Sequence, residues 1–359
     1  MAGTDRIAIV YPLDIRDIAA IHDRGVFLRE ELERLTGDQV RLFCYRREES
    51  EFTDEQITAV RGKFTVRGLR GFTDASALCK EVARWRPDVV LLRGVPFFWP
   101  FARLCRSFPT VLEIHDRDTE YADTLGPVYG VLQRMFRHAI LSRCKGALFV
   151  TRELRDFPGY QTITGPRIVV TNGVYVPEDI DEPVVGPRPV IGLSVGLPNP
   201  WQGVDYCQRL AALLPDVDFH VVSSRVRRDE AWPENMTVVT PGSSTDYRTA
   251  LSLCTVCLGS LALERAGLTE STALKVRDYA ALGVPIALFS TDTDLSACGD
   301  PMVRTITPPV RGIEATAREL RAFVSEAQGR RLAPGTRRLV DRSEKAKLVA
   351  NLIMKVTTQ

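Results

Sequence analysis

The sequence lacks any long hydrophobic run. Near the N-terminus, MAGTDRIAIVYPLD contains an apolar stretch of about five residues, whereas a membrane-spanning helix needs about 18 or more. This stretch also lacks the length and the flanking residues of a secretory signal peptide. We therefore expect a cytoplasmic protein that does not cross a membrane.

A strong charge of either sign is also missing. The 47 lysines and arginines nearly balance the 45 aspartates and glutamates, which leaves a net charge of +2. This balance does not indicate nucleic-acid binding by the whole molecule, and we expect no such partner. The 359 residues, with 45% hydrophobic and 26% charged side chains, are ordinary for a globular protein. At about 100–200 residues per domain, the length predicts two domains.

The cysteines do not have the spacing of a metal or redox centre. Of the eight cysteines, only Cys254 and Cys257 are separated by two residues. No second pair and no nearby histidine accompany them, so we interpret them as reduced thiols of the core. Asp292 and Asp294 follow a predicted strand, but we interpret this segment as a loop. We expect neither a bound metal nor a cofactor.

Two common nucleotide-binding fingerprints are absent. No Gly-x-Gly-x-x-Gly follows the first predicted strand, and the glycines of GLPNPWQG (196–203) have the wrong spacing. A Gly-x-x-x-x-Gly-Lys-Ser/Thr loop is missing as well. These absences argue against a dinucleotide-dependent dehydrogenase and against a P-loop enzyme.

Short apolar runs alternate with amphipathic segments along the chain. Runs that are apolar almost throughout are typical of parallel strands covered on both faces. The alternation itself predicts doubly wound α/β domains. In the first half we predict strands at 6–12, 40–46, 89–94, 110–116, 146–151 and 167–174, and helices at 25–37, 76–88 and 131–143.

A proline- and acid-rich stretch at 175–189 predicts a linker, after which the pattern starts again. We therefore predict two Rossmann-like domains, residues 1–178 and 179–340, that face each other across a cleft. Open α/β sheets bind ligands beyond the carboxyl ends of their strands, so the cleft is the expected site. The second half has predicted strands at 190–196, 217–224, 236–240, 255–260 and 284–290, and helices at 203–215, 245–254, 271–282, 312–328 and 342–356.

The stretch TESTALKVRDYAALGVPIALFS (269–290) has the pattern of a ligand site. A helix is predicted from Ser271, and the amides of a first helical turn attract anions such as phosphate. Glu270 precedes this turn and suits hydroxyl groups, because a carboxylate repels phosphate. Asp278, about two turns on, suits a second diol such as a ribose. Together they describe a site for a nucleoside diphosphate sugar. The alternative is that Glu270 caps its helix and Asp278 is a solvated surface residue.

ESTALKVRDYAALGVP resembles the donor-site signature of family 4 glycosyltransferases, which have the GT-B fold. That signature is a glutamate, seven residues, a second glutamate and an alanine-rich helix ending in Gly-x-Pro. The resemblance covers nearly the whole chain, and it implies an N-terminal acceptor domain, a C-terminal donor domain and a final helix within 341–359 that crosses back to the first domain. Further similar stretches, in the expected order, are RPDVVLLRG, TVLEIHD, VVTNGVYVP, GLSVGLPNPWQGVDYCQRLAALLPDVDFHVVSS and CTVCLGS.

The resemblance assigns roles to three residues. Glu270 matches the glutamate that contacts the hydroxyls of the donor sugar. Asp278 matches the second glutamate, which holds the nucleotide ribose, although an aspartate is one methylene shorter. His115, in EIHD, matches a histidine that faces the donor sugar from the opposite domain. The alternative for His115 is a polar residue at the end of a strand.

The predicted diphosphate site departs from the family pattern. The family usually has an arginine after Val-Gly and a lysine before Gly-Val-Asp, where this sequence has Leu197 and Gln202. A leaving group with two negative charges needs compensating positive charge. Candidate cations are Lys275, Arg225 and Arg227, and the alternative for Arg225 is a solvated surface arginine. In the family the diphosphate also meets the amides of a turn that corresponds to Ser271, Thr272 and Ala273.

The resemblance implies a retaining, metal-independent glycosyltransferase. It would move a sugar from a nucleoside diphosphate sugar to a hydroxyl of a glycan, a lipid-linked acceptor or a small molecule. The alternatives are a non-catalytic scaffold subunit that has lost the diphosphate cations, and an epimerase or phosphorylase of the same architecture. The loops at 12–25 and 61–71 are candidates for acceptor binding, and the second of them is basic.

The helix in YGVLQRMFRHAILSRCK (129–145) is cationic and amphipathic. This pattern predicts peripheral contact with an anionic membrane on its cytoplasmic face. The alternative is a core helix with a solvated basic rim.

Overall fold

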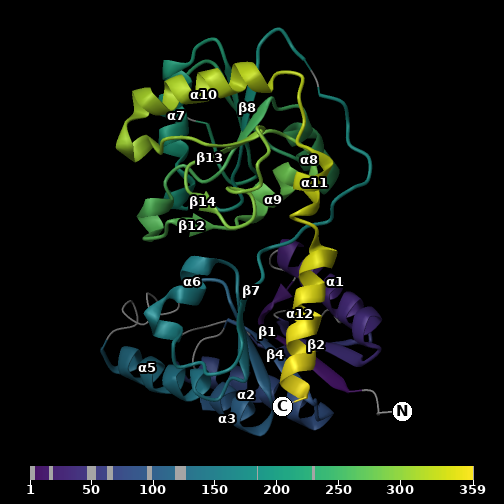
Figure 1. The fold of residues 1–359 in the computed structure, drawn as a ribbon. Coiled ribbons are helices and arrows are strands. Elements are labelled where there is room, and N and C mark those ends of the chain that lie inside the picture. The colour runs from purple at the N-terminus through teal and green to yellow at the C-terminus, as the bar shows by residue number, and fades with distance from the viewer. Residues whose placement is uncertain are drawn as a thin grey trace. The chain divides into compact units, whose positions relative to one another are not determined.

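The computed structural model describes residues 5–15, 19–46, 54–62, 68–94, 99–117, 127–183, 185–228 and 231–358. The chain divides into two compact units (Figure 1). Unit 1 contains Met1–Val170 and Ala346–Gln359, and unit 2 contains Thr171–Lys345. The chain therefore passes from unit 1 to unit 2 once and returns once, within its final helix.

The described strands of unit 1 form a single parallel sheet with the order β3-β2-β1-β4-β5-β6-β7. The order reverses beside β1, as in a doubly wound fold, so the predicted parallel α/β architecture is confirmed. Parallel strands are nearly all apolar here because helices cover both faces of the sheet. The strands are β1 (Arg6–Asp14), β2 (Gln39–Arg46), β3 (Ile57–Arg61), β4 (Val89–Arg93), β5 (Thr110–Ile114), β6 (Gly146–Phe149) and β7 (Arg167–Val169).

Two helical layers cover the sheet of unit 1. Buried side chains of α1 (Ala19–Thr36) and α12 (Arg342–Thr357) pack on one face, for example Leu32 and Ile353 against Ile9. Side chains of α2 (Gly68–Trp85), α3 (Trp99–Ser107) and α5 (Pro127–Leu141) pack on the other. Figure 1 shows α12, in yellow, beside α1. The short helices α6 (Arg152–Asp156) and η2 (Pro158–Tyr160) follow β6.

Unit 2 repeats the plan with the parallel order β10-β9-β8-β11-β13-β15. The order reverses between β8 and β11, which makes the carboxyl ends of these two strands the place where such a sheet binds ligands. The strands are β8 (Val190–Ser194), β9 (Asp218–Val222), β10 (Met236–Val239), β11 (Val256–Leu258), β13 (Ile286–Leu288) and β15 (Val303–Thr305). The helices are α7 (Val204–Leu213), α8 (Ser244–Ser252), α9 (Leu274–Ala281), α10 (Ile313–Ala327), α11 (Pro334–Arg338), η3 (Pro200–Gln202), η4 (Leu263–Ala266) and η5 (Pro309–Arg311).

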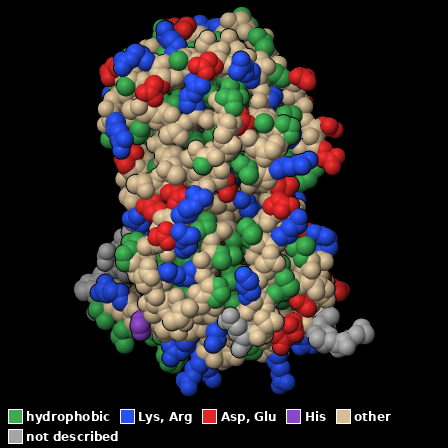
Figure 2. Space-filling model, viewed as in Figure 1, with side chains coloured by type: hydrophobic (Ala, Val, Ile, Leu, Met, Phe, Trp, Pro, Cys, Tyr) green, Lys and Arg blue, Asp and Glu red, His purple; other side chains and the backbone are tan. Residues whose placement is uncertain are grey.

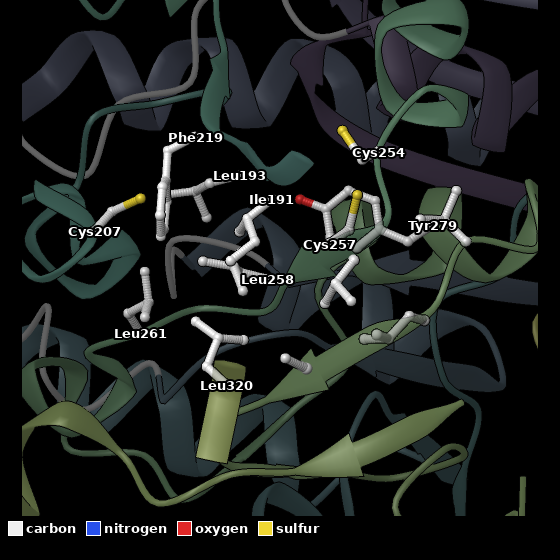
Figure 3. Packing of buried hydrophobic residues seen from close by; sticks show 14 of the residues in the cluster. Ile191, Leu193, Cys207, Phe219, Cys254, Cys257, Leu258, Leu261, Tyr279 and Leu320 are labelled. Carbon is white, nitrogen blue, oxygen red and sulfur yellow. The ribbon is translucent and has the colours of Figure 1, made fainter. Parts of the chain in front are cut away.

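Helices also cover both faces of this second sheet. Figure 1 shows α7 and α10 on one side and α8, α9 and α11 on the other. The core between them includes Cys254 and Cys257, which lie buried beside Ile191 and Tyr279 (Figure 3). A Cβ on Gly192 would come within 2.6 Å of the Cys254 sulfur. The two thiols therefore pack directly against the backbone of Gly192, where there is no room for a side chain. These cysteines belong to the packed interior.

The signature segment differs in one respect from its prediction. Glu270–Ser271 form a short strand, β12, which pairs in parallel with β14 (Thr291–Asp292), and helix α9 starts only at Leu274. The sequence suggested a helix from Ser271 because its pattern of small and apolar residues continues into α9. A helix could not supply the pairing of Glu270 with Thr291 and of Ser271 with Asp292.

No helix among the described residues is both long and apolar enough to cross a bilayer. On the face that Figure 2 displays, acidic and basic side chains are intermingled over unit 2. This mixture matches the nearly balanced charge of the sequence.

Candidate functional site

The candidate donor site starts at the N-terminus of α9. Ala273 is the N-cap residue, and no side chain caps the helix. The first bonds of the helix run from the amides of Val276 and Arg277 to the Ala273 carbonyl. The helix therefore supplies no acceptor for the amides of Leu274 and Lys275, which can bind an anion. They follow directly after Ser271, Thr272 and Ala273, whose amides the sequence analysis predicted to meet the diphosphate.

Glu270 lies in β12, three residues before the N-cap residue Ala273, and is only 7% exposed. Its Oε1 accepts a hydrogen bond of 2.8 Å from Oγ1 of Thr293. Because β12 pairs with β14, the backbone beside Glu270 is fixed as well as its side chain. The carboxylate is thus held in one orientation by a neighbouring loop that the sequence analysis did not assign to the site.

Lys275 of α9 and Gln202 of η3 lie 73 positions apart in the sequence and are brought together by the fold. Nζ of Lys275 donates to Oε1 of Gln202 at 2.7 Å, although Lys275 is only 8% exposed. Burial lowers the pKa of Lys275 to about 7. Gln202 ends η3 just before Gly203, whose left-handed φ of 72° turns the chain into α7. A Cβ on Gly203 would lie 2.6 Å from Cβ of Leu261, so this turn requires glycine.

Asp278 lies about one turn into α9 and faces the carboxyl end of β8. Its Oδ2 accepts a bond of 3.1 Å from the Tyr247 hydroxyl, which lies 3.0 Å from Oγ of Ser194. Burial raises the pKa of Asp278 to about 6, against the opposing effects of Tyr247 and Arg248. Asp278 is therefore not the solvated surface residue of the alternative interpretation.

Arg277 is a site residue that the sequence analysis missed. Its side chain is fully buried, and Nη1 and Nη2 donate to Asp292 at 2.6 and 3.0 Å. Nη2 also lies 3.3 Å from Oδ2 of Asp294, and Nε donates to the carbonyl of Asn172. The sequence did contain a signal for this residue: the apolar neighbours of Arg277 in α9 indicate that it faces inward. A buried arginine requires carboxylate partners from elsewhere in the chain.

Three further positions from the sequence analysis, Arg225, Leu197 and Arg227, lie outside this cluster. Arg225 is exposed and lines a groove of about 380 Å³ with Pro198, Asp205 and Trp232. No residue of α9 lines that groove. Leu197, at the position of the family's arginine, is 47% exposed and carries no charge. Arg227 donates to the carbonyls of Ser224 and Val226 in its own loop.

His115 lies in unit 1, at the carboxyl end of β5. Its Nε2 is 3.0 Å from Oε1 of Glu113, a carboxylate that also pairs with Arg24 and Arg93. Burial of Glu113 would raise its pKa, but Arg24, His115 and Arg93 hold it well below its usual range. Burial and Arg93 lower the pKa of His115 to about 4, so the imidazole is neutral at neutral pH. A neutral ring can exchange hydrogen bonds with sugar hydroxyls.

The predicted acceptor loops and the predicted membrane helix also lie in unit 1. Residues 16–18 and 63–67 of the loops at 12–25 and 61–71 fall outside the described residues. The amphipathic segment forms α5, on which Val131, Leu132 and Met135 are 40–61% exposed. Trp99 of α3 is 52% exposed, and its ring centroid lies 6.1 Å from that of Phe136 with the ring planes tilted by 56°. Among the described residues, no group of three or more His, Cys, Asp and Glu side chains is placed to hold a metal ion.

Comparison with known proteins agrees with this architecture. Residues 26–174 match the model of Glycosyltransferase Family 4. A sucrose-phosphate synthase from Thermosynechococcus elongatus aligns with a TM-score of 0.70 at 12% identity, over 99% of both chains. The protein has the GT-B fold. The lipopolysaccharide outer core galactosyltransferase WaaB gives a TM-score of 0.65 at 12% identity, over 98% of this chain and 99% of that one.

An α,α-trehalose 6-phosphate synthase from Burkholderia multivorans gives a TM-score of 0.64, also at 12% identity and over 99% of both chains. No curated protein matches the chain. At such low identity the structural matches establish the fold. The predicted resemblance to GT-B glycosyltransferases of family 4 is thereby confirmed, while the role of each residue depends on its chemistry.

Proposed function

We propose that this GT-B protein is a retaining glycosyltransferase that binds a nucleoside diphosphate sugar at the N-terminus of α9. The observation that carries the proposal is the contact between Lys275 and Gln202. It supports a single buried cation beside the first amides of α9, in place of the two cations that the family usually has near positions 197 and 202. A buried ammonium is costly without an anion, and a diphosphate would supply one.

The two carboxylates of the site would bind different parts of the donor. Glu270, fixed by Thr293, accepts hydrogen bonds from the hydroxyls of the transferred sugar. Asp278, beside Tyr247, accepts those of the ribose. Two carboxylates that flank the phosphate-binding amides along the chain would distinguish a nucleotide sugar from a free nucleotide, because only the nucleotide sugar has hydroxyls for both.

In the proposed reaction the bond between the anomeric carbon and the diphosphate breaks, and the acceptor hydroxyl attacks from the same face. Negative charge grows on the departing diphosphate, where Lys275 and the amides of Leu274 and Lys275 stabilise it without a metal ion. The departing phosphate oxygen takes the proton of the acceptor hydroxyl. His115 is proposed to hold a hydroxyl of the donor sugar through its neutral ring. The acceptor is proposed to be a glycan, a lipid-linked sugar or a small molecule.

A thermal-shift screen of UDP, GDP, ADP, dTDP and their common sugar conjugates tests the binding step. We expect the nucleotides of one base to raise the melting temperature of the protein. The protein should also release free sugar from the matching nucleotide sugar by slow hydrolysis. Glu270→Gln should abolish hydrolysis and retain binding of the free nucleoside diphosphate. Glu264→Gln, a substitution of an exposed glutamate in η4, is the matched control and should change neither. A protein that binds no nucleotide in the screen would refute the proposal.

The second candidate is a non-catalytic scaffold with the same fold. It is favoured by the uncharged, exposed Leu197 at the place of the family's arginine. A scaffold would show no hydrolysis of any conjugate, and Leu197→Arg would not increase turnover. A glycosyltransferase with weakened charge compensation would gain turnover from the same substitution.

A further inference from the structure

The chain crosses between the two units at Val170–Thr171 and at Lys345–Ala346. In unit 2 these two crossing segments lie against each other. The amide of Val174 donates to the carbonyl of Val340, and the amide of Arg342 donates to the carbonyl of Val174, both at 2.9 Å. A Cβ on Gly173 would come within 2.7 Å of Cα of Arg342, so the approach depends on glycine. The two crossings behave as one structural element within unit 2.

A single carboxylate oxygen binds the side chains at both crossings. Oδ2 of Asp294 accepts from Oγ1 of Thr171 at 2.6 Å and from Nζ of Lys345 at 3.1 Å. The three side chains are shielded from solvent, since Thr171 is 3% and the other two are 15–16% exposed. Hydrogen bonds between charged groups are strong when they are removed from water. Asp294 therefore fixes the outgoing and the returning chain at one point.

The residue before Asp294 connects this point with the proposed donor site. Thr293 donates to Glu270, while Asp292 on its other side binds Arg277 of α9. Three consecutive residues thus contact the sugar-binding carboxylate, the donor helix and the chain crossings. Because the three residues are consecutive, a shift of their shared backbone would move all three side chains.

Arg277 makes this connection rigid. It is fully buried and binds Asp292 through two nitrogens, with Asp294 at 3.3 Å from Nη2. A second path runs through Asn172, whose carbonyl accepts from Arg277 and whose Nδ2 donates at 2.8 Å to the carbonyl of Thr272. Thr272 lies between Glu270 and α9, so both paths end at the same turn.

We propose that Thr293 is a positioning residue for Glu270 and that Asp294 couples this carboxylate to both chain crossings. The proposal rests on the donor site described above. Binding of a sugar to Glu270 would tighten the tripeptide 292–294 and thereby order residues 171–174 and 340–345. Loss of the Asp294 contacts would loosen both crossings even without a ligand.

Hydrogen exchange on the ligand-free protein tests the coupling independently of catalysis. Asp294→Asn should increase exchange at the amides of Val174 and Arg342 about tenfold, and Thr171→Val, which has nearly the same shape, should do so to a smaller extent. Thr291→Val, a substitution of an exposed residue of the same loop, is the control and should leave both amides unchanged. Unchanged protection of these amides in folded Asp294→Asn and Thr171→Val would overturn the coupling, whether or not the protein binds nucleotides.

Kinetics on the nucleotide sugar identified by the screen test the positioning role. Thr293→Val should lower kcat about tenfold and leave the affinity for the free nucleoside diphosphate unchanged, and Thr293→Ser should restore kcat. If Thr293→Val lowered kcat and nucleotide affinity equally, Thr293 would have only a structural role. If the glycosyltransferase proposal were wrong, the protein would bind no nucleotide in the screen, while the expected changes in hydrogen exchange would still be observed.

Discussion

Nζ of Lys275 donates a hydrogen bond of 2.7 Å to Oε1 of Gln202, and this pair joins the first turn of α9 to the end of η3. The sequence has an uncharged residue at 202, where the resemblance to family 4 leads one to expect a lysine, and it has a lysine at 275. In space the two positions are neighbours, so a cation at either one can reach the same ligand. In the proposed donor site, Lys275 would therefore supply the positive charge that position 202 lacks.

This geometry predicts that the positive charge can be exchanged between the two positions. Lys275→Gln should lower kcat with the nucleotide sugar about 100-fold, as expected when a charge-stabilising donor is removed. The double variant Lys275→Gln/Gln202→Lys should recover most of that loss, because the ammonium returns to the same space. Steady-state kinetics of the two variants check this. If the double variant were as slow as the single one, the ammonium group would be effective only from position 275.

Donor affinity should depend on pH through two residues of α9. Asp278 has a pKa of about 6 and Lys275 a pKa of about 7, so the form with both groups charged is most populated between these values. Affinity for the nucleotide sugar should rise as Asp278 ionises and fall at higher pH as Lys275 loses its proton. A bound diphosphate would raise the pKa of Lys275 and so move the falling limb to higher pH. Calorimetric titration at several pH values measures the profile; Asp278→Asn should remove only the rising limb and Lys275→Met only the falling one.

Asp278 also predicts a dependence of folding stability on pH. Its pKa is about 6 in the folded protein and about 4 in the unfolded chain, so the unfolded state releases its proton first as pH rises. The free energy of unfolding should therefore decrease between about pH 4 and pH 6. Asp278→Asn should remove this slope and be more stable than the wild type at pH 7 by about 1–3 kcal/mol. Urea unfolding at both pH values measures the difference; a variant that is less stable at pH 7 would contradict it.

The sequence predicted the architecture better than the site, and particular residues explain why. Strands such as β11 and β13 are apolar throughout, and that local pattern indicates parallel strands between helices. Glu270 and Asp278 could be proposed from the sequence because the predicted signature fixes their spacing along the chain. The partners of these residues are distant in sequence: Thr293 lies 23 positions from Glu270 and Gln202 lies 73 from Lys275. Such contacts leave no local periodicity, and the start of α9 was misplaced because pairing with β14 decides it.

The exposed face of α5 predicts binding to anionic lipid. Val131, Leu132 and Met135 are 40–61% exposed beside the basic side chains of the same helix. At low salt, the protein should sediment with vesicles containing phosphatidylglycerol and remain in solution with neutral phosphatidylcholine vesicles. Met135→Glu should weaken sedimentation about tenfold. Met354→Glu, at another exposed methionine on α12, is the control and should have no effect. Absence of sedimentation at low salt would exclude this membrane contact.

The buried pair of Arg277 and Asp292 should dominate the stability of the donor site. Arg277→Met leaves the Asp292 carboxylate, 4% exposed, without its principal cation, and breaking such a pair costs about 3–5 kcal/mol. Arg304→Met is the matched control, because Arg304 pairs with Glu326 through two bonds at a site where both side chains are at least 33% exposed. Its loss should cost less than about 1 kcal/mol. The double variant Arg277→Met/Asp292→Asn should recover part of the loss, since no buried charge then stands alone. Urea unfolding followed by tryptophan fluorescence gives the three differences, and equal destabilisation by Arg277→Met and Arg304→Met would show that burial adds nothing to the pair.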